Sequence, residues 1–66
     1  MAIEKVNLPT ARKMANLTQR DLAEKCGVSE STVLNWEKGK SYPNVKHAEL
    51  ICKAVGLNYD DIIFLV

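Results

Sequence analysis

A short pattern that begins α-helices occurs three times in this chain of 66 residues. Each copy has a helix-capping residue, with one apolar residue directly before it and another four positions after it. Such a cap satisfies free backbone N–H groups, and the apolar pair fixes the angle at which the chain joins the helix. Three copies in so short a chain predict several short helices with defined starts. The capping residues are Thr18, Ser29 and Asn58.

Glycines mark the ends of these helices. Gly27, Gly39 and Gly56 each stand where a helix needs a left-handed residue after its last turn, and Asn16 can fill that role before Thr18. No run of four or more residues alternates convincingly at period two, so the sequence predicts no sheet and an all-α fold. The five predicted helices span residues 8–15, 19–26, 30–38, 45–55 and 59–65.

The apolar residues of the predicted helices recur at spacings of three and four, and they therefore form one stripe on each helix. These stripes are expected to pack together as the core. Cys26 and Cys52 lie on them, and buried free thiols behave as small apolar groups. We favour that interpretation over a redox switch between the two cysteines. The other predicted inward residues are Leu22, Ala23, Val33, Trp36, Val45, Ala48, Ile51 and Val55.

The segment from Thr18 to Gly39 is typical of a helix-turn-helix. Only residues 27–29 separate its two predicted helices, and a turn of this length presents the second helix outward. An α-helix fits the major groove of duplex DNA, where base edges display a readable pattern of donors and acceptors. The outer face of the second helix carries Ser31, Thr32 and Asn35, whose short polar side chains suit that task.

Two runs of sequence, LTQRDLAEKCGVS at residues 17–29 and WEKGK at residues 36–40, resemble the phage-repressor/Cro-like (XRE-type) helix-turn-helix family. The likeness extends from about Leu8 to Ile62, and Pro43 falls where that family has its own proline. The resemblance implies one compact five-helix, lambda-repressor-like DNA-binding domain over residues 1–66, with the helix-turn-helix at about residues 18–38. It also implies dimeric operator binding, with the helix at 30–38 as the recognition helix.

The same resemblance assigns roles to individual residues. The start of the second helix, at Thr18 and Gln19, would meet the DNA backbone, and a helix N-terminus suits a phosphate. Gln19 could be an ordinary exposed first residue, but the family match and the helix dipole favour the phosphate contact. Arg12 and Glu37 match a pair that forms an internal salt bridge in relatives. Residues matching base-facing positions are Glu30, Ser31 and Asn35, with Thr32 beside them, and residues matching backbone-facing positions are Lys38 and Lys40.

Two further residues complete the predicted DNA-binding set. Ser29 begins the recognition helix as its cap. Tyr42 lies in the following loop, where its hydroxyl could contact a phosphate or its ring could pack against Pro43. Glu30 has two interpretations of equal weight, a base contact to cytosine or a charge that only stabilises the helix dipole. Trp36 is expected to be a packing residue and not a base-stacking surface.

Charge is distributed unevenly along the chain. The net charge is +1, which excludes a strongly basic coat. Residues 1–46 hold eight Lys and Arg against five Asp and Glu, a net of +3, whereas residues 47–66 hold one Lys and three acids, a net of −2. The predicted DNA-facing part is therefore the positive part, which would orient the approach to DNA.

Other site classes find little support in the sequence. His47 has no second ligand at a metal-binding spacing, so we expect no metal and no cofactor. No catalytic motif or glycine-rich phosphate loop is present, so we expect no enzyme and no small-molecule substrate. Neither a signal peptide nor a membrane span is apparent, and with only two cysteines the chain is expected to be cytoplasmic.

These features predict a sequence-specific, double-stranded DNA-binding transcriptional regulator, most simply a repressor that occupies an operator. A homodimer, at least on DNA, would read two half-sites; Leu50 and the apolar tail 62–66 are candidates for its interface. The tail could instead fold back on its own core. The alternative function is a protein-interaction module, such as an antitoxin-like subunit with secondary DNA binding. An apolar Leu34 on the outer face and the low net charge favour that alternative.

Overall fold

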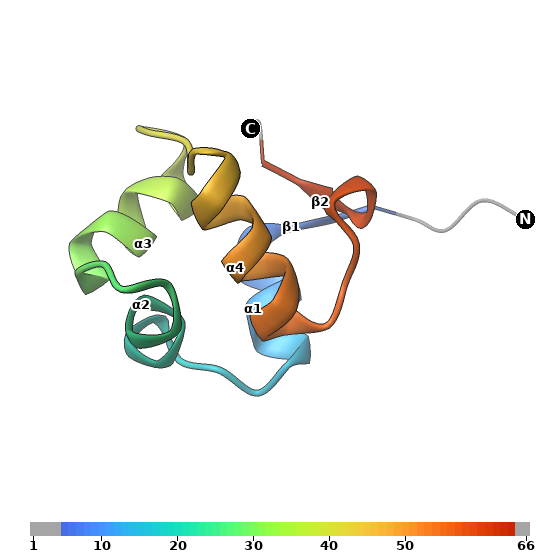
Figure 1. Ribbon diagram of the computed structural model, residues 1–66, viewed down its shortest axis with the longest axis horizontal. Coiled ribbons are helices and arrows are strands. Elements are labelled where there is room, and N and C mark those ends of the chain that lie inside the picture. The colour runs from blue at the N-terminus through green and yellow to red at the C-terminus, as the bar shows by residue number, and fades with distance from the viewer. Residues whose placement is uncertain (1–4, 65–66) are drawn as a thin grey trace, which may run out of the picture.

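The computed structural model describes residues 5–64 and places four α-helices around a shared core (Figure 1). After α4 the chain forms a 3-10 turn, η1, and two short strands pair in parallel, with Val6 opposite Ile62. None of these helices is long and apolar enough to cross a membrane. The elements in chain order are β1 (Val6–Asn7), α1 (Leu8–Met14), α2 (Gln19–Cys26), α3 (Glu30–Lys38), α4 (Val45–Val55), η1 (Tyr59–Asp61) and β2 (Ile62–Ile63).

The bounds of α2, α3 and α4 agree with the predicted ranges, and the predicted stops explain why. The glycines after these three helices are all left-handed, with φ of 71°, 76° and 73°. Asn16 is also left-handed, with φ of 59°, which places it beyond the end of α1. At the start of α2, the Thr18 hydroxyl accepts from the Asp21 N–H at 3.0 Å, and the Asp21 carboxylate accepts from the Thr18 N–H at 3.0 Å.

The predicted fifth helix at 59–65 is wrong, and so is the expectation of no sheet. The start pattern at Asn58 does form a turn, because Asp61 accepts from the Asn58 N–H at 3.2 Å. The chain then becomes extended at Ile62, with φ of −115° and ψ of 134°. Consecutive β-branched isoleucines favour a strand, and β1 lies beside them as a partner. Leu65 and Val66 of the predicted helix lie outside the described residues.

The predicted inner stripes form the core, with one exception. Leu22, Val33 and Ile51 are fully buried, and residues of α1 and β2 join them in one cluster. Cys52 and Val55 are half-buried at its edge. Val45 was expected to point inward but is 78% exposed, because this first residue of α4 lines a surface groove instead.

Candidate nucleic-acid interface

The α3 helix lies at one end of the molecule, at the left of Figure 1, with α2 packed beneath it. The turn between them is fixed at both sides, since the Val28 N–H donates to the Ala23 carbonyl at 3.0 Å and Ser29 caps α3. The helix buries Val33 and Trp36. Its opposite side is therefore presented to solvent.

The exposed side of α3 carries polar side chains that have no hydrogen-bond partner within residues 5–64. Glu30 and Ser31 are exposed, and Asn35 is half-exposed one turn further along. These are the three residues that the sequence analysis placed opposite the bases. Leu34 lies on the same side and is 37% exposed. The surface is thus chiefly polar, with a single aliphatic group.

Ser29 and Thr32, also predicted to bind DNA, are engaged with each other. The Ser29 hydroxyl accepts from the Thr32 N–H at 3.2 Å, and the two hydroxyl oxygens are 3.0 Å apart. This pair caps the first turn of α3. Its hydroxyls hold the start of the helix in place. The sequence pattern alone does not distinguish this capping role from a contact to DNA.

The start of α2 retains two free backbone donors. The reciprocal cap between Thr18 and Asp21 uses the N–H groups of these two residues, which leaves those of Gln19 and Arg20 without a helical acceptor. The hydrogen bond from the Thr18 N–H, as the main cause, lowers the pKa of the Asp21 carboxyl. That carboxylate therefore remains ionised well into the acid range and reduces the positive potential of this helix end.

A buried polar network joins α1, α2 and α3. The Arg12 Nε donates to Glu37 Oε2 at 2.7 Å, and the two side chains are only 10% and 7% exposed. Arg12 also donates to the Leu17 carbonyl at 2.9 Å. Glu37 Oε1 accepts from the Gln19 amide at 3.0 Å, a contact that sequence reasoning missed. The Gln19 amide keeps one hydrogen that it can donate to another acceptor, so its bond to Glu37 does not occupy all of its donors.

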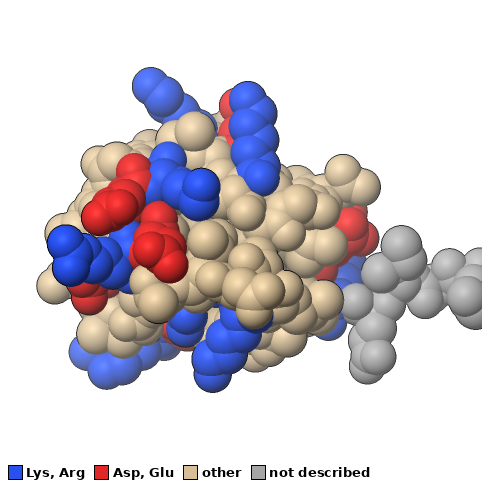
Figure 2. Space-filling view, turned by 90° about the horizontal axis from the view of Figure 1, so that it is seen from below, with Lys and Arg blue, Asp and Glu red and all other residues tan. Residues whose placement is uncertain are grey.

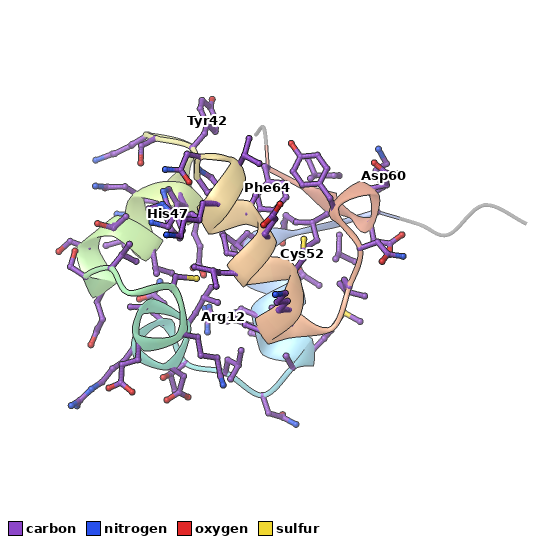
Figure 3. The ribbon with its side chains drawn as sticks, in the orientation of Figure 1. Arg12, Tyr42, His47, Cys52, Asp60 and Phe64 are labelled. Atoms are coloured by element: carbon purple, nitrogen blue, oxygen red, sulfur yellow. The ribbon has the colours of Figure 1, made fainter. Side chains whose placement is uncertain are left out.

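Basic side chains border α3 at its C-terminal end. Lys38 and Lys40 are exposed, and the Lys40 N–H donates to the Asn35 carbonyl at 2.9 Å, which fixes the loop that carries it. Tyr42 is 52% exposed and projects away from the helices (Figure 3). The face seen in Figure 2 carries acidic and basic side chains side by side and no continuous basic patch.

The remaining candidate residues have structural roles. Trp36 is 5% exposed, with its ring centroid 5.5 Å from that of His47 on α4, which confirms the predicted packing role. Burial raises the pKa of the thiols of Cys26 and Cys52, and both cysteines are free. Among the residues the structure describes, no three His, Cys, Asp or Glu side chains gather closely enough to hold a metal ion.

Comparison with known proteins gives several matches. A family model described as helix-turn-helix matches residues 10–62. An uncharacterized HTH-type transcriptional regulator of Methanocaldococcus jannaschii is 49% identical over 51 residues, which cover 77% of each chain. A second such regulator, from Methanothermobacter thermautotrophicus, is 38% identical over 83% of this chain and 80% of its own. The HTH-type transcriptional activator BcrR of Enterococcus faecalis is 38% identical over 85% of this chain, which corresponds to 28% of the activator. No solved structure matches significantly.

Proposed function

Because the chain belongs to the helix-turn-helix family of DNA-binding transcriptional regulators, we propose that it binds a specific duplex operator with α3 in the major groove. In this proposal it acts as a homodimer and represses transcription by blocking access to a promoter. The observation that carries the proposal is the exposed polar face of α3, whose side chains are free to pair with base edges.

Base contacts would come from three side chains on that face. Asn35 can bond an adenine through both atoms of its amide, Ser31 can bond most bases, and Glu30 can accept from a cytosine amino group. Ser29 and Thr32 would support this reading surface by fixing the first turn of α3. The sequence read by the protein would then depend on very few residues.

Backbone contacts would set the position of α3 in the groove. The free N–H groups of Gln19 and Arg20, with the remaining amide hydrogen of Gln19, suit one phosphate beside the cap at Thr18. Lys38, Lys40 and Tyr42 would contact the backbone at the other end of α3. With so few cations near one α3 helix, a dimer reading two half-sites about 34 Å apart would add the needed affinity.

The test is selection of bound duplexes from a random DNA pool, followed by fluorescence anisotropy on the selected site at several salt concentrations. We expect a recurring site with two-fold symmetry and an affinity that falls as salt rises, because backbone contacts release counterions. Enrichment of no site, with binding only to a protein partner, would contradict the proposal and favour the interaction-module alternative.

The direction of regulation needs a separate measurement. A transcription assay with the selected site placed over a promoter should show less transcript as protein is added. More transcript would contradict repression while leaving operator binding intact. The name of the E. faecalis relative, which is an activator, makes this arm of the test necessary.

A further inference from the structure

Leu34 is an aliphatic residue on the side of α3 that otherwise carries polar groups. Its side chain is 37% exposed. The helix packs into the molecule through Val33 and Trp36, and Leu34 is not among the apolar residues that form the core or pack against it. Leu34 therefore adds an apolar group to the surface that the proposed function assigns to base edges.

Charged side chains stand one helical turn to either side of Leu34. Glu30 precedes it by four residues, Lys38 follows it by four, and both are exposed. Residues four apart lie on the same side of a helix, with Cβ atoms about 5–6 Å apart. The outer side of α3 thus carries a ridge, Glu30–Leu34–Lys38, in the order acid, aliphatic group and base.

Glu30 and Leu34 are placed so that both can contact one base. Glu30 takes part in none of the ion pairs or side-chain hydrogen bonds among the described residues. A helical side chain lies over the turn N-terminal to its own Cα, so Leu34 covers the turn that begins at Glu30. The first residues of a recognition helix are those that reach base edges. A free carboxylate and an aliphatic group are therefore offered side by side.

These two groups match the major-groove edge of a methylated pyrimidine. A 5-methyl group is apolar and suits an aliphatic side chain, and it is present in thymine and in 5-methylcytosine. The neighbouring ring carbon of a cytosine carries an amino group, which donates to a carboxylate. In thymine the same carbon carries an oxygen that only accepts, which a carboxylate repels. The methyl group thus has two possible sources, and Glu30 favours 5-methylcytosine over thymine.

The charges at the two ends of the ridge allow an acid to lie in the groove. Glu30 is in the first turn of α3, where the positive end of the helix dipole stabilises a carboxylate. Lys38, in the last turn, lies at the end that suits a phosphate. Repulsion between Glu30 and the DNA backbone is reduced in this way, while its carboxylate remains able to accept.

We propose that Glu30 and Leu34 form a subsite for 5-methylcytosine in the operator. Leu34 contacts the 5-methyl group, and Glu30 accepts from the amino group beside it. The inference rests on the proposed function, because it requires α3 in the major groove. It adds a form of regulation, since occupancy of the operator rises when one of its cytosines is methylated.

The experiment places cytosine, 5-methylcytosine, uracil and thymine in turn at each pyrimidine of the selected operator, with guanine or adenine opposite as pairing requires. These four bases vary the amino group and the methyl group separately. At one position of each half-site, the methyl group should tighten wild-type binding about fourfold in both pairs of bases, the value of one buried methyl group. There, 5-methylcytosine should bind about tenfold more tightly than thymine, as one hydrogen bond to a charged group allows. Fluorescence anisotropy measures the four dissociation constants.

Variants assign each preference to its side chain. Leu34→Ala should lose the methyl preference and keep the amino preference, whereas Leu34→Met, which stays apolar, should keep both. Glu30→Gln should keep the methyl preference and reduce the preference for 5-methylcytosine over thymine, because an amide can also donate to the thymine oxygen. Ile63→Ala is the matched control: it trims a similarly exposed aliphatic side chain on β2, 42% exposed, and should leave every ratio unchanged. Circular dichroism verifies that all variants are folded.

The outcomes separate this inference from the proposed function. Equal methyl ratios in the wild type and in Leu34→Ala overturn the inference, as does a wild type that binds thymine at least as tightly as 5-methylcytosine at the methyl-sensitive position. In both cases the selected operator leaves the proposed function standing. Selection that enriches no site contradicts the proposed function itself, and Leu34 then supports the interaction-module alternative.

Discussion

The two ends of this molecule are held in different ways. At the α2–α3 end, the buried Arg12–Glu37 pair and the Gln19 amide join three helices through polar groups with defined geometry. At the other end, β1 and β2 are two residues each, and Ile62, 5% exposed, is their main anchor to the core. The end that carries α3 is therefore fixed by directional contacts, and the end away from it by apolar packing.

This difference has consequences for stability. The stability of the protein depends strongly on both members of a buried ion pair, because removing one leaves the other charged and unpaired in the protein interior. An apolar anchor loses only the burial of the atoms removed, together with the cost of the cavity left behind. Substitutions at the two ends should therefore change the free energy of unfolding by different amounts. They should also differ in which second substitution restores stability.

The largest effect is expected from Glu37→Ala. Without its partner, the Arg12 guanidinium, 10% exposed, stays buried with one acceptor, the Leu17 carbonyl. Breaking a buried pair in this way costs about 3–5 kcal/mol, enough to unfold much of so small a protein. Urea unfolding followed by circular dichroism measures the loss.

The matched control for this variant is Glu24→Ala. Glu24 lies 3.5 Å from Arg20 in an ion pair whose side chains are 68% and 76% exposed, and such surface pairs contribute at most about 1 kcal/mol. The double replacement Arg12→Met/Glu37→Leu should recover much of the lost stability, because no charge is stranded. Equal stability of Glu37→Ala and Glu24→Ala would show that the α2–α3 end does not depend on the buried ion pair.

The second effect is expected at the opposite end. Ile62→Ala removes buried methyl groups from β2 and should cost about 2–4 kcal/mol. The matched control, Ile63→Ala, changes the neighbouring residue, which is 42% exposed, and should change the free energy of unfolding by less than about 0.5 kcal/mol. If the two variants unfold at the same urea concentration, β2 does not anchor this end.

The third effect concerns DNA binding and separates base contacts from backbone contacts. Asn35→Ala should cost about 1–3 kcal/mol on the selected site and relax preference at one position, with the salt dependence unchanged. Lys40→Ala should weaken binding to all sequences and make the salt slope shallower by about one unit per subunit. Anisotropy titrations at several salt concentrations measure both quantities.

Two further variants sharpen that test. Gln19→Ala should weaken all sequences with little change in slope, since its amide is uncharged, and it should also lower stability by about 1 kcal/mol through the lost bond to Glu37. Ile63→Ala, at the opposite end, should bind as the wild type does. If Asn35→Ala and Lys40→Ala, both folded, also bind as the wild type does, α3 is not the reading helix.

The two ends also differ in how far the sequence predicts them. Caps and left-handed glycines are local signals, and they predicted the bounds of α2, α3 and α4. The turn at Asn58 was signalled equally well, but the conformation of the chain after that turn depends on β1, which lies more than fifty residues away, and a two-residue strand has no period to detect. The Gln19–Glu37 bond and the exposure of Val45 likewise depend on how helices meet, and no spacing along the chain encodes that.

The smallest predicted effect is a pH dependence at the start of α2. The pKa of Asp21 is lowered, chiefly by the hydrogen bond from the Thr18 N–H, so the folded state binds this proton less readily than the unfolded chain does. The cap's contribution is therefore fully present above the ordinary pKa of an aspartate, near 3.8, and is lost as the pH falls below it.

Asp21→Asn should lower stability at pH 6 but lose less stability than the wild type between pH 5 and pH 3. Thr18→Ala, which keeps the backbone N–H but removes the hydroxyl, should retain most of the wild-type pH dependence, because the N–H is the main cause of the shift. Urea unfolding of the three proteins across this range measures the slopes; parallel slopes for wild type and Asp21→Asn would show that the cap does not favour the ionised carboxylate.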